Sequence, residues 1–153
     1  MAAAEAGADG VAAHAKLVLV ALLGAGQFAQ KSQAPALLKL SSPRVRIAAV
    51  YSRSEDRARQ LAGWVAEQPA EGGSCREGDP QGAPVPDVYW DEGGPDRSLD
   101  ALLARPDVQA CVMSLPICVQ PQAVLRCLRA GKAVLSEKPI AGSLAEAREL
   151  VTS

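Results

Sequence analysis

An unbroken apolar run over residues 17–23 leads directly into the string Gly24-Ala25-Gly26-Gln27-Phe28-Ala29. A continuous apolar run of this length is typical of a parallel strand that is buried on both faces. Gly24 permits a tight turn out of the strand, and Gly26 lets the backbone approach a ligand without a Cβ in the way. The small Ala29 lets a following helix pack closely on the strand. The fold is therefore predicted to begin with a strand, a tight turn and a helix.

The same alternation of strand-like and helical patterns continues along the chain. We expect strands over residues 17–23, 45–51, 88–90, 108–115 and 133–136. We expect helices over residues 27–40, 54–65, 98–104, 122–130 and 143–151. Pro35 must kink or shorten the first helix, Ser54 can cap the second, and Ser143 with Glu146 forms a capping box on the last. The pattern predicts an α/β protein with a doubly wound parallel sheet and helices on both faces.

The length of the chain limits its domain organisation. With 153 residues it can bury the core of one domain, but hardly of two. Residues 1–15 are rich in alanine and are expected to form a disordered tail. Residues 67–87 are rich in Gln, Pro, Gly, Glu and Ser and predict a long surface loop. A single domain is therefore expected over residues 16–153.

Composition argues against several classes of function. A net charge of −1 and an aromatic content of 3% disfavour binding to nucleic acid. The cysteines at 75, 111, 118 and 127 lack Cys-x-x-Cys spacing and His14 lies in the tail, so we expect no metal site. Cysteines 111, 118 and 127 stand among apolar residues and are expected to be buried. Because no apolar run could span a bilayer and the tail lacks signal-peptide features, the sequence favours a cytoplasmic protein without a membrane partner.

The glycine turn is suited to binding a dinucleotide. The amides of Gln27 and Phe28 stand at the start of a helix, where they can donate hydrogen bonds to the phosphates of the nucleotide. A Gly-x-Gly-x-x-Ala string is a weak signal by itself, because it also occurs in ordinary tight turns between a strand and a helix. Both interpretations stay open at this point.

The end of the second strand favours NADP over NAD as the cofactor. NAD-binding domains place an acid there for the ribose 2′-hydroxyl, whereas no acid occurs here before Glu55. Ser52 can instead donate a hydrogen bond to a 2′-phosphate, and Arg53 and Arg57 supply positive charge. In the alternative interpretation both arginines are surface residues that pair with Glu55 or Asp56. NAD is then the alternative cofactor.

Two more segments are expected at the edge of the sheet where ligands bind. Ser114-Leu115-Pro116, with Gln120 shortly after it, ends the fourth strand, and Glu137-Lys138-Pro139 follows the fifth. In doubly wound sheets, ligands bind outside the carboxyl ends of the strands. From the residues alone, Lys138 is equally consistent with an ordinary surface lysine, because most lysines are exposed.

Together, these segments resemble the N-terminal half of the glucose-fructose oxidoreductase / inositol dehydrogenase / MocA family. The resemblance runs from about Leu17 to Val151. It rests on four strings: Gly24-Ala25-Gly26, Ala49-Val50-Tyr51-Ser52-Arg53-Ser54, Asp107-Val108-Gln109-Ala110-Cys111-Val112 and Ala130-Gly131-Lys132-Ala133-Val134-Leu135-Ser136-Glu137-Lys138-Pro139. The last string is the most specific, because an Ala-Gly-Lys-x-Val-Leu strand that ends in Glu-Lys-Pro is a hallmark of that family.

The resemblance implies a Rossmann domain of an NAD(P)-dependent oxidoreductase that acts on sugars, cyclitols or related carbonyl compounds. It implies that Lys138 is the catalytic residue, which orients the reacting hydroxyl or assists proton transfer while hydride moves to or from the nicotinamide. Partial burial beside the cofactor would lower the pKa of this lysine, and Glu137 would oppose that shift. The resemblance also allows a cis peptide before Pro139.

The chain departs from the family pattern in three ways. Leu115 stands where the family commonly has threonine, and Gln120 replaces a histidine, so that it can hydrogen-bond a nicotinamide ribose or amide but cannot titrate. Family members also continue into a second domain that supplies most of the substrate pocket and usually the oligomer interface. We therefore expect this chain to be inactive without such a domain. The alternatives are a nucleotide-binding or regulatory module without catalysis, and a partial gene product that does not fold stably.

Overall fold

The computed structural model describes residues 17–40, 45–68 and 84–152. The tail predicted over residues 1–15 and most of the loop predicted over residues 67–87 lie outside the described residues. At the two ends of that loop the prediction was too wide. The helix α2 (Glu55–Glu67) still includes Glu67, and the strand β3 (Asp87–Trp90) already includes Asp87.

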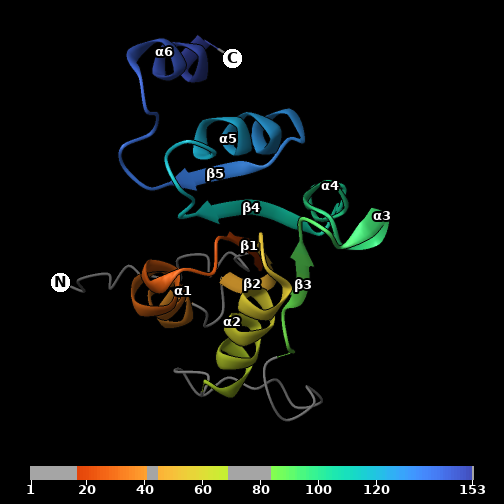
Figure 1. Cartoon of the computed structure of the whole chain (residues 1–153). Coiled ribbons are helices and arrows are strands. Elements are labelled where there is room, and N and C mark those ends of the chain that lie inside the picture. The colour runs from red at the N-terminus through yellow and green to blue at the C-terminus, as the bar shows by residue number, and fades with distance from the viewer. Residues whose placement is uncertain (1–16, 41–44, 69–83, 153) are drawn as a thin grey trace, which may run out of the picture.

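Five parallel strands form one sheet in the order β3-β2-β1-β4-β5, which confirms the predicted fold class (Figure 1). The other strands are β1 (Val18–Leu23), β2 (Val45–Ser52), β4 (Val108–Met113) and β5 (Ala133–Ser136). Leu23, at the carboxyl end of β1, is in register with Tyr51 of β2 and with Met113 of β4. The loops that follow these strands are therefore brought together at one edge of the sheet.

Helices cover both faces of the sheet and divide the core in two (Figure 1). On one face lie α1 (Ala34–Leu40) and α2, and on the other lie α4 (Leu99–Leu103) and α5 (Gln120–Arg129). Because side chains alternate along a strand, Val20 and Leu22 of β1 enter the first core and Ala21 and Leu23 the second. This two-sided burial explains why the strand is apolar without interruption.

Pro35 does not end the first helix. Helical structure runs from residue 27 to residue 40, but Ala29–Gln33 form a π-helical turn, η1, in which the amide of Ala34 donates to the carbonyl of Ala29. Proline has no N–H to donate and its ring crowds the preceding turn, and a widened turn accommodates both effects. The predicted interruption therefore takes the form of a local widening rather than a break.

The capping predictions had different outcomes. Ser143 and Glu146 form the predicted reciprocal box: the Glu146 amide donates to Ser143 Oγ at 3.3 Å, and the Ser143 amide donates to Glu146 Oε2 at 3.1 Å. This box opens α6 (Leu144–Thr152). Ser54 does occupy the N-cap of α2, but its side chain makes no capping hydrogen bond.

Other boundaries differ from the predictions by a few residues. The strand β4 ends at Met113, and α5 begins at Gln120, so the turn between them holds the apolar Leu115, which the pattern placed in the strand. A short helix, α3 (Gly94–Arg97), was not predicted. Cys111 and Cys127 are buried as expected, but Cys118 is exposed, because it lies in the turn before α5 and not within an element.

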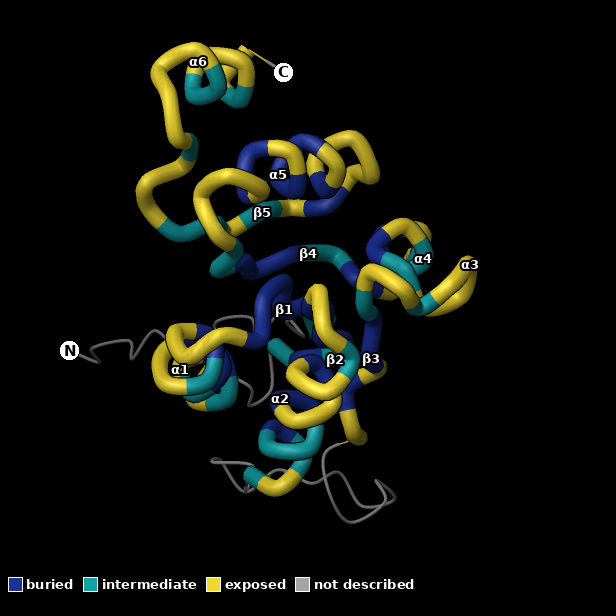
Figure 2. Tube along the Cα trace, viewed as in Figure 1, coloured by how far each residue is buried: buried dark blue, intermediate teal, exposed yellow. Residues whose placement is uncertain are grey.

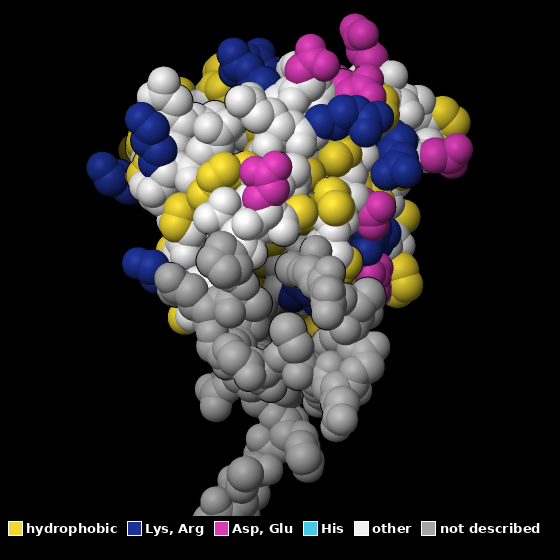
Figure 3. Space-filling view, turned by 90° about the horizontal axis from the view of Figure 1, so that it is seen from below, with side chains coloured by type: hydrophobic (Ala, Val, Ile, Leu, Met, Phe, Trp, Pro, Cys, Tyr) yellow, Lys and Arg dark blue, Asp and Glu magenta, His cyan; other side chains and the backbone are white. Residues whose placement is uncertain are grey.

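The exposed surface is mixed in character. Figure 2 shows the contrast between the buried central strands and α6, which has no buried residue. Among the described residues, Leu135, Leu144 and Val151 are exposed apolar side chains toward this end of the chain. In Figure 3, Lys and Arg side chains occur on the same face as Asp and Glu, with no large area of one sign among the described residues.

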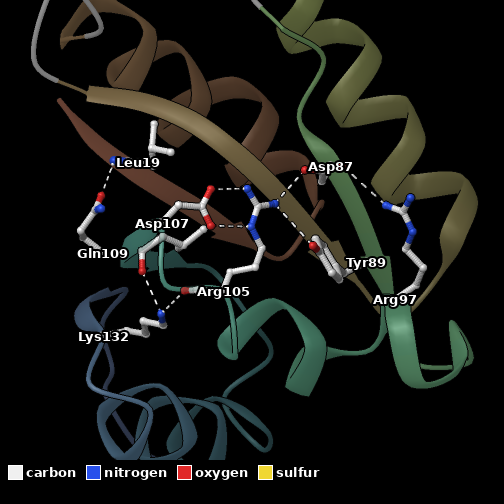
Figure 4. Close-up of polar contacts among 9 residues, drawn as sticks. Leu19, Asp87, Tyr89, Arg97, Arg105, Asp107, Gln109 and Lys132 are labelled. Carbon is white, nitrogen blue, oxygen red and sulfur yellow. Dashed lines mark hydrogen bonds and ion pairs between the residues drawn. The ribbon is translucent and has the colours of Figure 1, made fainter.

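A polar network closes the opposite, amino-terminal edge of the sheet (Figure 4). Arg105 donates to Asp107 at 2.7 and 3.0 Å, to Asp87 at 2.8 Å and to the hydroxyl of Tyr89 at 3.4 Å. Hydrogen bonding with Asp107 raises the pKa of Arg105, and the same contact lowers the pKa of Asp107. Buried Lys132 donates to the carbonyls of Arg105 and Val108 at 2.5 and 2.9 Å. The starts of β3, β4 and β5 are tied together by these contacts.

Candidate functional site

A cavity of about 520 Å³ opens at the carboxyl edge of the sheet. It is lined by Gly24, Ala25, Gly26, Phe28, Ser52, Arg53, Arg57, Ser114, Leu115, Pro116, Glu137 and Lys138. All of these except Ala25 are residues that the sequence nominated as a cofactor or catalytic site. They come from the four segments that follow β1, β2, β4 and β5, which the parallel register brings to the same edge. Of the nominated residues, Gln27 and Gln120 do not line the cavity.

The two glycines of the first turn differ in their surroundings. Gly24 has a φ of +109°, and a Cβ placed on it would lie 2.5 Å from the backbone oxygen of Ser114. It is glycine because the turns after β1 and β4 approach closely there. A Cβ on Gly26 would meet no atom within 4 Å, so the missing side chain leaves open space in the cavity. That space is where the Gly-x-Gly pattern predicts a pyrophosphate.

Two arginines of the site have no acidic partner in the described parts of the chain. Glu55, one of the two acids that could have neutralised them, is bound by Arg59 at 2.6 Å, and no ion pair of the other, Asp56, occurs among the described residues. The guanidinium of Arg59 also lies 5.7 Å from the centre of the Trp90 ring, within reach of a cation–π interaction. Arg53 and Arg57 therefore present their charge to the cavity rather than to Glu55.

The cavity contains a buried hydroxyl that needs a partner. Ser114 Oγ is buried and has no hydrogen-bond partner among the described residues. An unsatisfied buried polar group costs about 1–3 kcal/mol. Ser52 also lines the cavity and is buried, and its Oγ accepts a hydrogen bond from the amide of Ser54 at 3.4 Å. Hydroxyls and cations together fit a ligand that carries phosphate and polar ribose or amide groups.

Tyr51, next to Ser52, does not contribute a proton donor to the cavity. Its hydroxyl donates a hydrogen bond to Asp91, and its ring packs in the core beside Tyr89 and Leu99. Burial and the bond to Asp91 raise the pKa of Tyr51. The phenol therefore stays protonated at physiological pH and anchors the end of β2.

Lys138 lines the cavity and is exposed. The Lys138–Pro139 peptide is cis, as the family resemblance allowed. The neighbouring Glu137 is half-buried, and its amide donates to the carbonyl of Met113 at 3.2 Å. No ion pair joins Glu137 to Lys138 in the part of the chain that the structure describes.

Gln120 lies behind the cavity instead of facing it. Only 2% of the residue is exposed, and its Nε2 donates to the carbonyls of Glu137 at 2.7 Å and Pro139 at 3.0 Å. The expected contact with a nicotinamide ribose or amide therefore has no support in this geometry, because the side-chain donors are already used by backbone. Its assignment as a cofactor ligand stays an untested prediction.

Sequence reasoning missed Gln33. Its Nε2 donates to the carbonyl of Met113 and to Glu137 Oε1, both at 3.3 Å. A signal for it was present, because Gln33 falls four residues after Ala29 and four before Leu37, on the buried stripe of the first helix. A polar residue on an apolar stripe indicates a specific hydrogen-bond partner in the interior.

Other kinds of site receive no support from the described residues. No group of three or more metal-ligating side chains occurs among them. In the same part of the chain, no helix combines the length and apolar character that crossing a membrane requires.

The parallel sheet, the glycine turn and the cavity at the carboxyl edge define a dinucleotide-binding α/β domain. Comparison with known proteins places it more closely. A family model described as "Oxidoreductase family, NAD-binding Rossmann fold" (GFO_IDH_MocA) matches residues 18–153, so the chain belongs to this family. The family resemblance identified from the Gly131–Pro139 segment and the glycine turn is thereby confirmed.

Individual relatives agree with this assignment. The chain is 41% identical over 136 residues to "Dehydrogenase FPY6" of Fusarium mangiferae, covering 88% of this chain and 34% of that protein. It is 29% identical over 138 residues to a dTDP-3,4-didehydro-2,6-dideoxy-alpha-D-glucose 3-reductase of Actinomadura kijaniata, covering 90% of this chain and 33% of the reductase. The chain thus spans about a third of the length of these relatives.

Solved structures resemble the domain in the same region. The crystal structure of KijD10, a 3-ketoreductase from Actinomadura kijaniata in complex with NADP and TDP-benzene, matches with a TM-score of 0.66 and 26% identity. The match covers 90% of the present chain and 34% of the KijD10 chain. An oxidoreductase from Thermotoga maritima matches with a TM-score of 0.70 and 25% identity, again over 90% of this chain and 34% of the other.

Proposed function

We propose that the cavity binds NADP in preference to NAD. The observation that carries this proposal is that Arg53 and Arg57 line the cavity and form no ion pair with any described residue, which leaves both to face an anion. Ser52 and these two arginines would hold the 2′-phosphate. The open space at Gly26 and the amides of the following helical turn would receive the pyrophosphate. The related KijD10 was crystallised with NADP, which supports the same choice.

We further propose that the domain serves an oxidoreductase that acts on a sugar, cyclitol or related carbonyl compound, in the cytoplasm. NADP supplies the hydride acceptor or donor when it is bound. Lys138 would orient the reacting oxygen and hold or release a proton at Nζ, since its exposed amine stands at the cavity and has no ion pair with Glu137. The 3-ketoreductase relatives support a sugar-derived substrate. A substrate-binding domain of the kind found in the longer relatives would complete the active site.

Calorimetric titration with NADP and NAD tests the choice of cofactor. We expect tighter binding of NADP, and we expect Arg53→Ala to weaken NADP about 10- to 100-fold, because each charge-assisted hydrogen bond is worth about 1.5–3 kcal/mol. Its affinity for NAD should stay unchanged. Arg148→Ala, on exposed α6, removes the same charge at a remote position and serves as the control. Equal loss of NADP affinity in both variants, or tighter binding of NAD, would contradict the proposal.

Lys138→Ala separates binding from catalysis. The variant should bind NADP within about twofold of the native chain, because its amine is assigned to the reacting oxygen and not to the phosphates. With a substrate domain present, NADPH oxidation by keto sugars should fall by about 10²–10⁴-fold, as for the loss of a general acid or base. A variant that keeps the full rate would refute the catalytic role, and a native protein that binds NADP but turns over no carbonyl compound would favour a regulatory module.

A further inference from the structure

The backbone on each side of Lys138 leaves the sheet at the end of β5. This strand stops at Ser136, and beyond it the amide of Glu137 makes the last backbone hydrogen bond to the sheet, to Met113. Lys138 itself is exposed, and no hydrogen bond or ion pair of its side chain is found in the described chain. Its location at the cavity must therefore be fixed by other groups that grip the segment 137–139.

We propose that two buried glutamines, Gln33 and Gln120, are positioning residues that clamp the segment 137–139 and so fix Lys138 at the cavity. This proposal deepens the function proposed above, because it concerns the amine assigned to the reacting oxygen. The two side chains come from separate elements, the π-helical turn η1 and the start of α5, and bond to different groups of the segment.

Gln120 holds the backbone of the segment. Its single amide nitrogen donates to the carbonyls of Glu137 and Pro139, the two residues that flank Lys138. Both partners are acceptors, so the NH₂ group must face them and the orientation of the amide is determined. The backbone amide of Gln120 in turn donates to the carbonyl of Pro116 at 3.0 Å, which connects the segment to the turn that follows β4.

Gln33 holds the side chain of Glu137. Its Nε2 joins Glu137 Oε1 to the carbonyl of Met113, and Met113 is the residue that also accepts the amide of Glu137. The carboxylate is therefore bound toward the first helix, which agrees with the absence of an ion pair to Lys138 among the described residues. The amine is left available to a ligand in the cavity.

The hydrogen-bond donors and acceptors of each glutamine side chain indicate that its role is to position the segment and not only to stabilise the fold. The Oε1 atoms of Gln33 and Gln120 are both buried without a hydrogen-bond partner among the described residues. An unpartnered buried carbonyl is unfavourable, so an apolar residue of similar shape would serve packing alone better. What glutamine offers at both positions is two N–H donors directed at two acceptors.

The test measures acylation of the Lys138 amine by a succinimidyl ester, with site-resolved mass spectrometry, in the presence and absence of NADP. At a concentration of about ten times Kd, NADP should slow the acylation of Lys138 in the native chain by roughly tenfold, the limit set by the fraction of free protein. In Gln120→Leu and Gln33→Leu, the protection should fall to about twofold or less, measured at ten times each variant's own Kd. Gln120→His, which keeps one N–H donor, should give an intermediate value.

Gln109→Leu is the matched control. Gln109 also bonds backbone through its side-chain amide, accepting from the amide of Leu19 at 2.6 Å, but it does so at the opposite edge of the sheet (Figure 4). It should lower stability and leave the protection of Lys138 at the native value. Native protection in both Gln33→Leu and Gln120→Leu would overturn the clamp, and so would an equal loss in Gln109→Leu.

A measurement without cofactor keeps the two proposals distinguishable and covers variants that fail to fold. In the native chain, the side-chain NH₂ protons of Gln33 and Gln120 should exchange with solvent about tenfold or more slowly than those of exposed Gln27. Exchange as fast as that of Gln27 would overturn the clamp. If the native chain binds no NADP but shows slow exchange, the proposed function fails while the clamp stands.

Discussion

The two edges of the sheet carry similar charged groups but use them in opposite ways. At the amino edge, the guanidinium of Arg105 and the amine of Lys132 are saturated by carboxylates and carbonyls of the protein itself (Figure 4). At the carboxyl edge, Arg53, Arg57 and Lys138 line a cavity without an ion pair among the described residues. Cations satisfied within the fold stabilise it, whereas cations left facing a cavity are available to an anionic ligand.

One short string supplies a lysine to each edge. Gly131, with a φ of +71°, ends α5, and its amide and that of Lys132 donate to the carbonyls of Leu128 and Cys127. Lys132 then turns into the interior at the start of β5, while Lys138 emerges at the other end of the same strand. The family-specific string therefore contains one structural lysine before β5 and one lysine of the candidate site after it.

The largest expected effect tests whether the carboxyl edge of the sheet contributes to the stability of the fold as well as to ligand binding. Gly24→Ala should lower the free energy of unfolding by roughly 2–4 kcal/mol, because its Cβ would meet the Ser114 backbone and its φ is unfavourable for alanine. Chemical denaturation measures this loss. Gly26→Ala is the matched control: it should change stability by less than about 0.5 kcal/mol. It should weaken the binding of NADP by about tenfold or more, which corresponds to at least about 1.4 kcal/mol. Equal stability of the two variants would contradict the assignment.

A smaller effect is expected at the amino edge. Arg105→Ala removes hydrogen bonds to Asp87, Asp107 and Tyr89 and should lower the free energy of unfolding by about 2 kcal/mol. Affinity for NADP should stay unchanged, because no atom of this network lines the cavity. A variant with native stability, or one that loses NADP affinity while remaining folded, would contradict the assignment of stability to the amino edge and of binding to the carboxyl edge.

The smallest expected effect depends on pH. The bond to Arg105 lowers the pKa of Asp107 in the folded chain, so its stabilising contribution is present above the unfolded-state pKa of about 4 and is lost as pH falls through the lower folded value. The side chain of Asp107 is 47% exposed, and Asp107→Asn should therefore cost only about 0.5 kcal/mol at pH 7. Unfolding curves from about pH 7 to about pH 2.5 should show the two proteins converging below about pH 4. A difference that grows in acid would contradict this sign.

Much of the site could be predicted because each of its segments carries a local signal. Glycines at a strand end, an arginine in place of an acid and a lysine before a proline are visible without coordinates. The partner of Glu55 was not predicted, since three arginines lie within four residues of it. The structure pairs it with Arg59, whose guanidinium also lies near the Trp90 ring. Gln120 was expected to face the cofactor for a similar reason, because its distance from Pro116 does not show on which side of the turn its amide lies.

By itself, the sequence determined the alternation of strands and helices, the parallel sheet, the family and most of the residues that line the cavity at the carboxyl edge. These follow from periodicity and from local chemistry, which act over a few residues. Only the tertiary structure decided which charges are neutralised and which are left to a ligand, and which glutamines support Lys138 from behind. The support of Lys138 by Gln33 depends on contacts between residues 80 and 104 positions apart, with Met113 and Glu137. Packing sets such contacts, and no local pattern encodes them.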